Sequence, residues 1–263
     1  MRIGVTGCTS PIGENVCKNV VASGFELFRI GRKEEFFWRF GEGLPKLELD
    51  CLIHLAHDRG LNQKDFKTAT ESILRSLGNK TFLINLSSTS SHSKAISNYG
   101  KNKYFAEKLI NNHGGAVFKS GLIFRNDDLL NAGMLGTIHS VVDKFPILPL
   151  PYKGRNNFYF SEIDTLAKLL LESAIDRSPG TFRAFNPEAI DFSALVELTS
   201  LKLGTSKRVI HIPNALTEGI LQIARFSGTQ GILDSLLSLS SEISQSEIEE
   251  LLEPRLYFPS FKR

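Results

Sequence analysis

The sequence contains only three cysteines, two methionines and one tryptophan, and it has no long apolar run. Cys8, Cys17 and Cys51 lie in the first fifth of the chain without metal-ligand spacing, so neither a disulfide framework nor a zinc site is expected. No apolar run approaches the roughly 20 residues of a membrane-spanning helix. An apolar strand candidate begins at Arg2, where a signal peptide would carry its basic segment. We therefore expect a cytoplasmic protein with no membrane partner.

A block of lysines and arginines is also missing, although the formal net charge is +3. A nucleic-acid partner is therefore not expected, and anionic small molecules are the more natural ligands. Hydrophobic residues make up 41% of the 263 residues and charged residues 22%, which excludes a largely disordered chain. The chain is long enough to bury a large core.

Short apolar segments alternate with segments of helical spacing through the first half of the chain. Strands are expected over residues 2–6, 25–30, 51–56 and 81–86 and from residue 116, with helices over 11–23, 66–77 and 99–111 between them. Strands that alternate with helices form a parallel sheet covered on both faces. The sequence thus predicts an α/β fold with a Rossmann-type, doubly wound parallel sheet.

The stretch VTGCTSPIG, residues 5–13, has the pattern of a phosphate-binding turn. The backbone of such a turn approaches a pyrophosphate so closely that Cβ atoms would obstruct it, and unpaired N–H groups of the helix face the anion. Ser10 replaces the middle glycine of the usual fingerprint, and its hydroxyl is a candidate donor to phosphate. An ordinary strand-to-helix turn is the alternative. The residues expected to contact a dinucleotide here are Gly7, Thr9, Ser10, Pro11, Ile12 and Gly13.

The end of the second expected strand indicates which dinucleotide binds. Folds that prefer NAD place an acidic residue there for the ribose 2′-hydroxyl. This sequence has Gly31, Arg32 and Lys33 instead, with no carboxylate among them to repel a 2′-phosphate. Because a guanidinium binds phosphate in a bidentate manner, we expect Arg32 to favour NADP, with NAD as second choice. Solvated loop charges are the alternative for both cations.

The pattern loosens after residue 125, where KFPILPLPYKGRNN is rich in proline. We predict a dinucleotide-binding core over 1–125 and a small, mostly helical substrate-binding region over 126–263, with segments of about 156–190 returning to the core. Further helices are expected over 163–174, 192–203, 216–226 and 241–252. The last carries a face of glutamates that we expect to be solvated. They are Glu242, Glu247, Glu249 and Glu250.

Tyr99 and Lys103 are four residues apart in YGKNK, which places both side chains on one face of a helix. A nearby ammonium stabilises a phenolate and so lowers the pKa of the phenol. Such a phenol exchanges a proton with a carbonyl or hydroxyl group while a nicotinamide exchanges hydride. A chance pair on a helix is the alternative.

Five motifs occur in order: VTGCTSPIG, DCLIHLA, LSS at 86–88, YGKNKYFAEK and SGLIF at 120–124. Together they resemble the extended short-chain dehydrogenase/reductase superfamily, the NAD-dependent epimerase/dehydratase family of nucleotide-sugar epimerases, dehydratases and 4-keto reductases. The resemblance is clearest over residues 1–125. It implies an NAD(P)-dependent oxidoreductase or epimerase that acts at C4 of a nucleotide sugar, in cell-surface polysaccharide biosynthesis.

The resemblance also implies residue roles. Tyr99 would be the general acid/base, Lys103 would bind the nicotinamide ribose and lower the tyrosine pKa, and Ser88 would hydrogen-bond the reacting oxygen of the substrate. Arg155, in the loop YKGRNN, is a candidate ligand of the substrate diphosphate, with a solvated loop cation as the alternative. A homodimer through the Tyr–Lys helix is a further implication. The remaining cofactor contacts would be Leu55, Ala56, His57 and Ser120.

Two departures from the family pattern leave alternatives open. The segment between Ser88 and Tyr99 is shorter than usual, and Lys119 and Ser120 replace the usual Arg-Pro pair. A reductase of a small carbonyl compound is therefore one alternative. A non-catalytic NADP-binding redox sensor is the other, because a fold does not determine a function.

Overall fold

The computed structural model describes residues 1–58, 60–78, 80–125, 135–136, 139, 143, 147–151, 157–202, 204, 208–212 and 243–261. Its largest element is a seven-stranded sheet in the order β10-β6-β5-β4-β1-β2-β3. Every neighbouring pair in this sheet runs parallel. The strands are β1 (Arg2–Thr6), β2 (Glu26–Gly31), β3 (Phe36–Phe37), β4 (Cys51–His54), β5 (Phe82–Ser88), β6 (Ala116–Ser120) and β10 (Gly180–Ala184).

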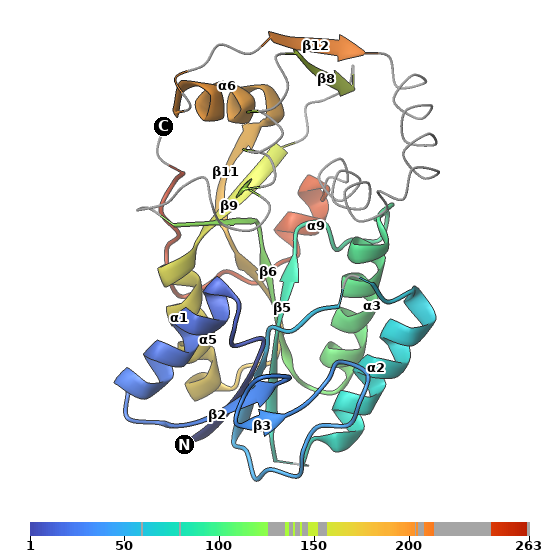
Figure 1. Cartoon of the computed structure of the whole chain (residues 1–263), viewed down its shortest axis with the longest axis vertical. Helices are drawn as coiled ribbons and strands as arrows, with labels where there is room; N and C mark the ends of the chain where they lie inside the picture. Colours follow the sequence, from blue (N-terminus) through green and yellow to red (C-terminus); the bar gives the residue numbers. More distant parts are fainter. Residues whose placement is uncertain are drawn as a thin grey trace.

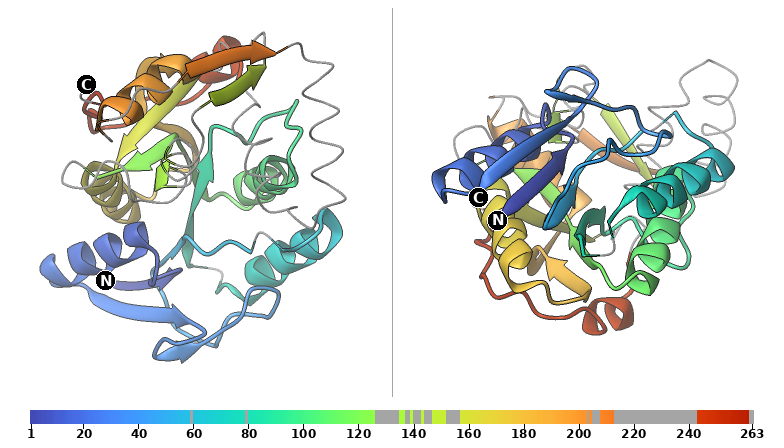
Figure 2. Two further views of the ribbon diagram at one scale, coloured as in Figure 1. Left: turned by 45° about the horizontal axis from the view of Figure 1, so that its top comes forward. Right: turned by 90° about the horizontal axis from the view of Figure 1, so that it is seen from below.

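Helices cover both faces of this sheet. The helices α1 (Pro11–Ala22) and α5 (Ile163–Asp176) pack together on one side, and α2 (Gln63–Ser76) and α3 (Asn98–Asn112) pack together on the other (Figure 1). The view from below in Figure 2 shows the same two layers. This arrangement confirms the predicted α/β fold with a doubly wound parallel sheet.

Alternation along the strands separates two apolar cores. Ile53 of β4 lies in the core beneath α1 and α5, whereas its neighbour Leu52 lies in the core beneath α2 and α3. Successive side chains of a strand point to opposite faces, so buried parallel strands must be apolar on both. β4 thus stabilises both helical layers at once.

Side-chain caps fix where the helices begin. The Ser10 hydroxyl accepts a hydrogen bond from the Gly13 N–H at the start of α1, where Pro11 occupies the first turn. Asn62 and Ser97 cap α2 and α3 in the same way. Each cap satisfies a backbone donor that the helix itself leaves unpaired. The first turns of α1 and α3 are thereby anchored beside the carboxyl ends of β1 and β5.

The second half of the chain adds two small sheets. One has the order β11-β9-β7 and the other pairs β12 with β8. Gly121 lies where the chain leaves β6, and a Cβ atom there would be 2.1 Å from the Tyr159 carbonyl oxygen. The elements of this half are β7 (Leu122–Phe124), β8 (Ile147–Pro151), β9 (Asn157–Glu162), β11 (Asn186–Asp191), α6 (Phe192–Lys202), β12 (Arg208–Ile212) and α9 (Gln245–Glu249).

The helix predicted over 241–252 is wrong in extent. The structure has only the five-residue α9, which begins after the cap Ser244. The helix ends at Glu249, and Leu252 beyond it exchanges backbone hydrogen bonds with Thr181 and Arg183 of β10. Glu249 and Glu250 are exposed as expected, whereas Glu247 is partly buried and bonds to another segment as described below. The helix predicted over 216–226 and Glu242 lie outside the described residues.

A search of the described residues found no helix that combines the length and apolar character needed to cross a membrane.

Candidate active site

The turn between β1 and α1 has the close backbone approach that a dinucleotide requires. Gly7 has φ of 76°, and a Cβ atom there would lie 2.9 Å from the Ala56 amide nitrogen. At Gly13 an added Cβ would be only 2.1 Å from the Gly7 carbonyl oxygen. Both positions therefore exclude any side chain, as the phosphate-binding fingerprint demands. The residues present thus fit a pyrophosphate at the start of α1.

The Ser10 hydroxyl holds this turn together from inside. It donates to the Gly7 carbonyl oxygen at 2.7 Å and accepts from the Gly13 N–H at 3.1 Å. Its proton is therefore engaged within the turn and is not directed outward to a phosphate. The backbone N–H groups of the first helical turn are the donors that suit an anion here.

A carboxylate does lie at the end of β2, contrary to the expectation from Gly31, Arg32 and Lys33. The chain folds back after Gly31, so that the Glu34 side chain lies over that glycine. The Glu34 carboxylate then pairs with the Arg29 guanidinium at 2.6 Å. Sequence spacing could not reveal this, because Glu34 reaches the strand end through a turn. Arg32 is exposed.

Thr6 is a site residue that the sequence reasoning missed. Its hydroxyl oxygen accepts hydrogen bonds from the Leu55 and Ala56 amides at 3.2 and 3.3 Å. The hydroxyl proton is then left for Nδ1 of His54, 2.8 Å away. Thr6 thus fixes the backbone that follows β4, where three of the predicted cofactor contacts lie.

His54 is a neutral, buried imidazole at the end of β4. Burial lowers the pKa of His54 to about 3, and the positive charge of Lys103 lowers it further in the same direction. The Phe40 ring stacks on the imidazole, with the two centroids 5.7 Å apart. A neutral ring adds no charge to the site.

Lys103 is the most confined of the predicted catalytic residues. It is 5% exposed, and its Nζ donates to the Leu86 carbonyl oxygen at 2.6 Å. Leu86 lies two residues before Ser88 on β5, so the ammonium lies against the strand that carries the predicted serine. Tyr99 is half-buried one helical turn before Lys103, on the same face of α3.

Ser88, the last residue of β5, and Tyr99, in the first turn of α3, flank a short loop at the carboxyl edge of the sheet. The Ser88 hydroxyl accepts from the Ser90 N–H at 3.2 Å. The Tyr99 ring meets the His57 ring edge to face, with centroids 4.8 Å apart. The carboxyl edge of a parallel sheet is where ligands bind in open α/β folds.

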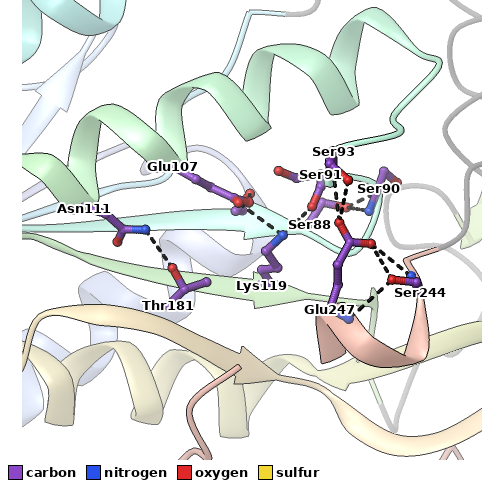
Figure 3. Close-up of polar contacts among 11 residues, drawn as sticks. Ser88, Ser90, Ser91, Ser93, Glu107, Asn111, Lys119, Thr181, Ser244 and Glu247 are labelled. Carbon is purple, nitrogen blue, oxygen red and sulfur yellow. Dashed lines mark hydrogen bonds and ion pairs between the residues drawn. The ribbon is translucent and has the colours of Figure 1, made fainter. Parts of the chain in front are cut away.

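Ser120 and Arg155 complete the set of predicted site residues. The Ser120 hydroxyl is buried and donates to the Ser87 carbonyl oxygen at 3.0 Å, so it joins the ends of β6 and β5. Its neighbour Lys119 points to Glu107 of α3, 3.1 Å away (Figure 3). Arg155 lies outside the described residues.

Comparison with solved structures shows which proteins share this fold. One match is UDP-N-acetylglucosamine 4-epimerase from Bacillus cereus (TM-score 0.58, 16% identity, 81% of this chain and 85% of that one). A dTDP-4-dehydrorhamnose reductase from Clostridium acetobutylicum has a TM-score of 0.61 at 12% identity, over 81% of this chain and 84% of that one. The chain has the fold of these nucleotide-sugar enzymes.

A third structure extends the range of activities on this fold. The dTDP-glucose 4,6-dehydratase from Bacillus anthracis, in complex with NAD, has a TM-score of 0.64 at 11% identity, over 81% of this chain and 84% of that one. No protein-family model matches the sequence, and no curated protein matches it significantly. The fold expected from the five motifs is thus confirmed by structure, at identities that sequence comparison alone does not detect.

Proposed function

We propose that the chain is an NAD(P)-dependent oxidoreductase or epimerase that acts at C4 of a nucleotide-linked sugar. The observation that carries the proposal is the buried Lys103 ammonium, fixed on β5 one helical turn from Tyr99. The ammonium is held on the face of α3 that carries Tyr99, and a nearby positive charge stabilises a phenolate. The sterically closed turn at Gly7 and Gly13 supports the dinucleotide.

Each residue of the site has a separate role in this proposal. The Tyr99 phenol gives or takes the proton of the sugar hydroxyl or carbonyl, and the nearby Lys103 ammonium stabilises its phenolate form. The Ser88 hydroxyl hydrogen-bonds the same substrate oxygen. The nicotinamide, when bound, supplies or accepts hydride. The first turn of α1 holds the pyrophosphate, and Arg32 binds the 2′-phosphate.

A fluorescence titration with NADPH and NADH tests the cofactor part first. We expect tighter binding of NADPH, reduced about tenfold by Arg32→Ala and unaffected by Lys18→Ala, a change to an exposed cation on α1. Tighter binding of NADH would overturn the NADP preference. It would indicate that Glu34, at the end of β2, binds the ribose 2′-hydroxyl of NAD. Absence of binding by either dinucleotide would overturn the whole proposal.

Replacement of Tyr99 by phenylalanine tests the chemistry. Turnover of a nucleotide sugar by Tyr99→Phe should fall by about 10²- to 10⁴-fold, the usual contribution of a general acid/base. Cofactor affinity should remain, because the phenol oxygen is not needed to hold the pyrophosphate. Retention of full activity would assign the proton transfer to another group.

A reductase of a small carbonyl compound is the second candidate, because the loop between Ser88 and Tyr99 is short and closely packed. A Cβ atom on Gly100 would lie 2.3 Å from the Ser90 carbonyl oxygen, so this loop lies directly on α3. Parallel assays with small aldehydes and ketones separate the two candidates. Faster NADPH oxidation with those compounds than with 4-keto sugar nucleotides would favour the second.

A further inference from the structure

The loop between β5 and α3 joins the two hydroxyl groups of the proposed acid/base chemistry. Ser88 begins it, and Tyr99 follows it in the first turn of α3. Gly100 allows the helix to touch the loop directly, since an added Cβ would be 2.3 Å from Ser90 O and 3.1 Å from Ser97 Oγ. The loop therefore packs directly against the first turn of α3, which carries Tyr99.

A buried ion pair holds the loop from the side of the sheet. Lys119 of β6 and Glu107 of α3 lie 3.1 Å apart, with side chains 7% and 6% exposed. Lys119 also donates to the Ser91 carbonyl oxygen, and Glu107 accepts from the Ser87 hydroxyl. The pair thus fixes the end of β5 and the middle of the loop together.

A second contact holds the loop from the C-terminal helix. The Glu247 carboxylate accepts from both the N–H and the hydroxyl of Ser93, at 3.2 and 3.0 Å (Figure 3). The two residues are 154 positions apart in the chain. Ser91 and Ser93 are separated by a single residue. The loop is therefore hydrogen-bonded to Lys119 of β6 and to Glu247 of α9 at nearly the same point.

The Glu247 side chain is oriented by its own helix before it meets Ser93. The Ser244 N–H donates to the Glu247 carboxylate at 3.2 Å, and the Ser244 hydroxyl oxygen accepts from the Glu247 N–H at 3.3 Å, which forms a capping box. The Ser244 hydroxyl also lies 2.8 Å from the carboxylate. Ile248, in the next position, is buried against Tyr159 and Phe185, which anchors α9. Partial burial works to raise the pKa of Glu247, but the hydrogen bonds from Ser244 and Ser93 together lower it to about 2. The group is therefore a carboxylate at neutral pH.

We propose that Glu247 is a positioning residue, which acts through Ser93 to fix the loop that sets Ser88 against Tyr99. The inference rests on the proposed function and deepens it, because it makes the C-terminal helix part of the active-site framework. Residues that hold reacting groups in place affect rate strongly, since a displacement of about 1 Å can cost about a hundredfold.

Steady-state kinetics of Glu247→Ala, Ser93→Ala and the double variant test the role, with Glu250→Ala as the control. Glu250 is an exposed glutamate at the end of the same helix. We expect kcat of Glu247→Ala to fall about tenfold with little change in KM, and Glu250→Ala to match the wild type. The double variant should be no slower than Glu247→Ala, because Ser93→Ala removes only the hydroxyl bond of a contact that Glu247→Ala already abolishes. Glu247→Gln, which keeps an acceptor, should recover part of the rate.

Hydrogen exchange of the loop amides gives a readout that does not depend on turnover. Amides over residues 91–95 should exchange faster in Glu247→Ala than in the wild type and Glu250→Ala. Unchanged exchange, or faster exchange with an unchanged kcat, would overturn the positioning role while leaving the proposed function intact. A cofactor affinity that falls in step with kcat would also overturn it, because that result indicates general loosening.

Failure of the proposed function would give different results from failure of the positioning role alone. The wild type would then turn over neither nucleotide sugars nor small carbonyl compounds, whatever the behaviour of the loop. The positioning role would be overturned with it, even if exchange showed that Glu247 orders the loop.

Discussion

The imidazole ring of His57 meets the phenol ring of Tyr99 edge to face, with their planes at 86° and their centroids 4.8 Å apart. Phe66 of α2 also packs against His57, at 5.2 Å between centroids. Edge-to-face pairs stabilise by about 0.5–1.5 kcal/mol beyond the area they bury. The histidine therefore joins the end of β4 and α2 to the face of α3 that carries the proposed acid/base.

Replacement of His57 by alanine should lower kcat about tenfold, because the Tyr99 ring loses the ring that supports it. His57→Phe keeps an aromatic edge and should retain most of the rate. The measurement is kcat and KM for both variants with the substrate identified by the assays above. Equal losses in both variants would show that an imidazole nitrogen matters, and the packing explanation would then be wrong.

Gly13→Ala should abolish dinucleotide binding and lower stability. The new Cβ would lie 2.1 Å from the Gly7 carbonyl oxygen, so the phosphate turn and α1 would have to separate. Overpacking of this kind costs about 1–3 kcal/mol. Thermal unfolding and NADPH titration check both effects.

Gly78→Ala is the matched control, because a Cβ there would make only an ordinary contact with Thr81 at 3.5 Å. Its affinity for the dinucleotide should equal that of the wild type. Normal binding by Gly13→Ala would show that the turn is looser than described.

Lys119→Met should destabilise the protein by about 3–5 kcal/mol, since it leaves the Glu107 carboxylate buried without its partner. Combination with Glu107→Gln should recover part of this loss, because no uncompensated charge is then buried. Urea unfolding measures the free energy of unfolding of the single and the double variant. Lys101→Met, at an exposed position, is the control. A loss below about 1 kcal/mol would mean that solvent reaches the pair.

The parallel sheet, the glycine turn and the Tyr–Lys helix were predictable because each depends on local patterns. Apolar runs, the glycine pattern of residues 5–13 and a four-residue spacing identify them without knowledge of the fold. The Glu34 carboxylate and the Ser93–Glu247 bond were not predictable, because a reversing turn creates the first and a contact between distant segments creates the second. The role of Thr6 was not predictable either. Threonine is common at the end of a strand, and the partners of Thr6 lie at or just after the end of β4, about 50 residues later in the chain.

The stability of the protein should fall as the pH drops below about 6.5, partly because of His54. Burial lowers the pKa of His54 in the folded state to about 3, whereas an unfolded chain has a histidine pKa near 6.5. Between these values the unfolded state binds a proton that the folded state does not, so acid favours unfolding. The contribution of the neutral His54 to the free energy of unfolding is complete above pH 6.5 and is lost as the pH falls toward 3. The free energy of unfolding then falls by up to about 1.4 kcal/mol per pH unit.

Urea unfolding at pH 7 and pH 5 measures this linkage. The side chain of His54→Gln can still accept a hydrogen bond from Thr6. From pH 7 to pH 5 the free energy of unfolding of this variant should fall by about 2 kcal/mol less than that of the wild type. His113→Gln is the control, because His113 is exposed. Equal losses in the wild type and His54→Gln would show that the imidazole is protonated in the folded state. An NMR titration of the His54 ring in the wild type gives the same answer without a substitution, since its resonances should not move between pH 8 and pH 5.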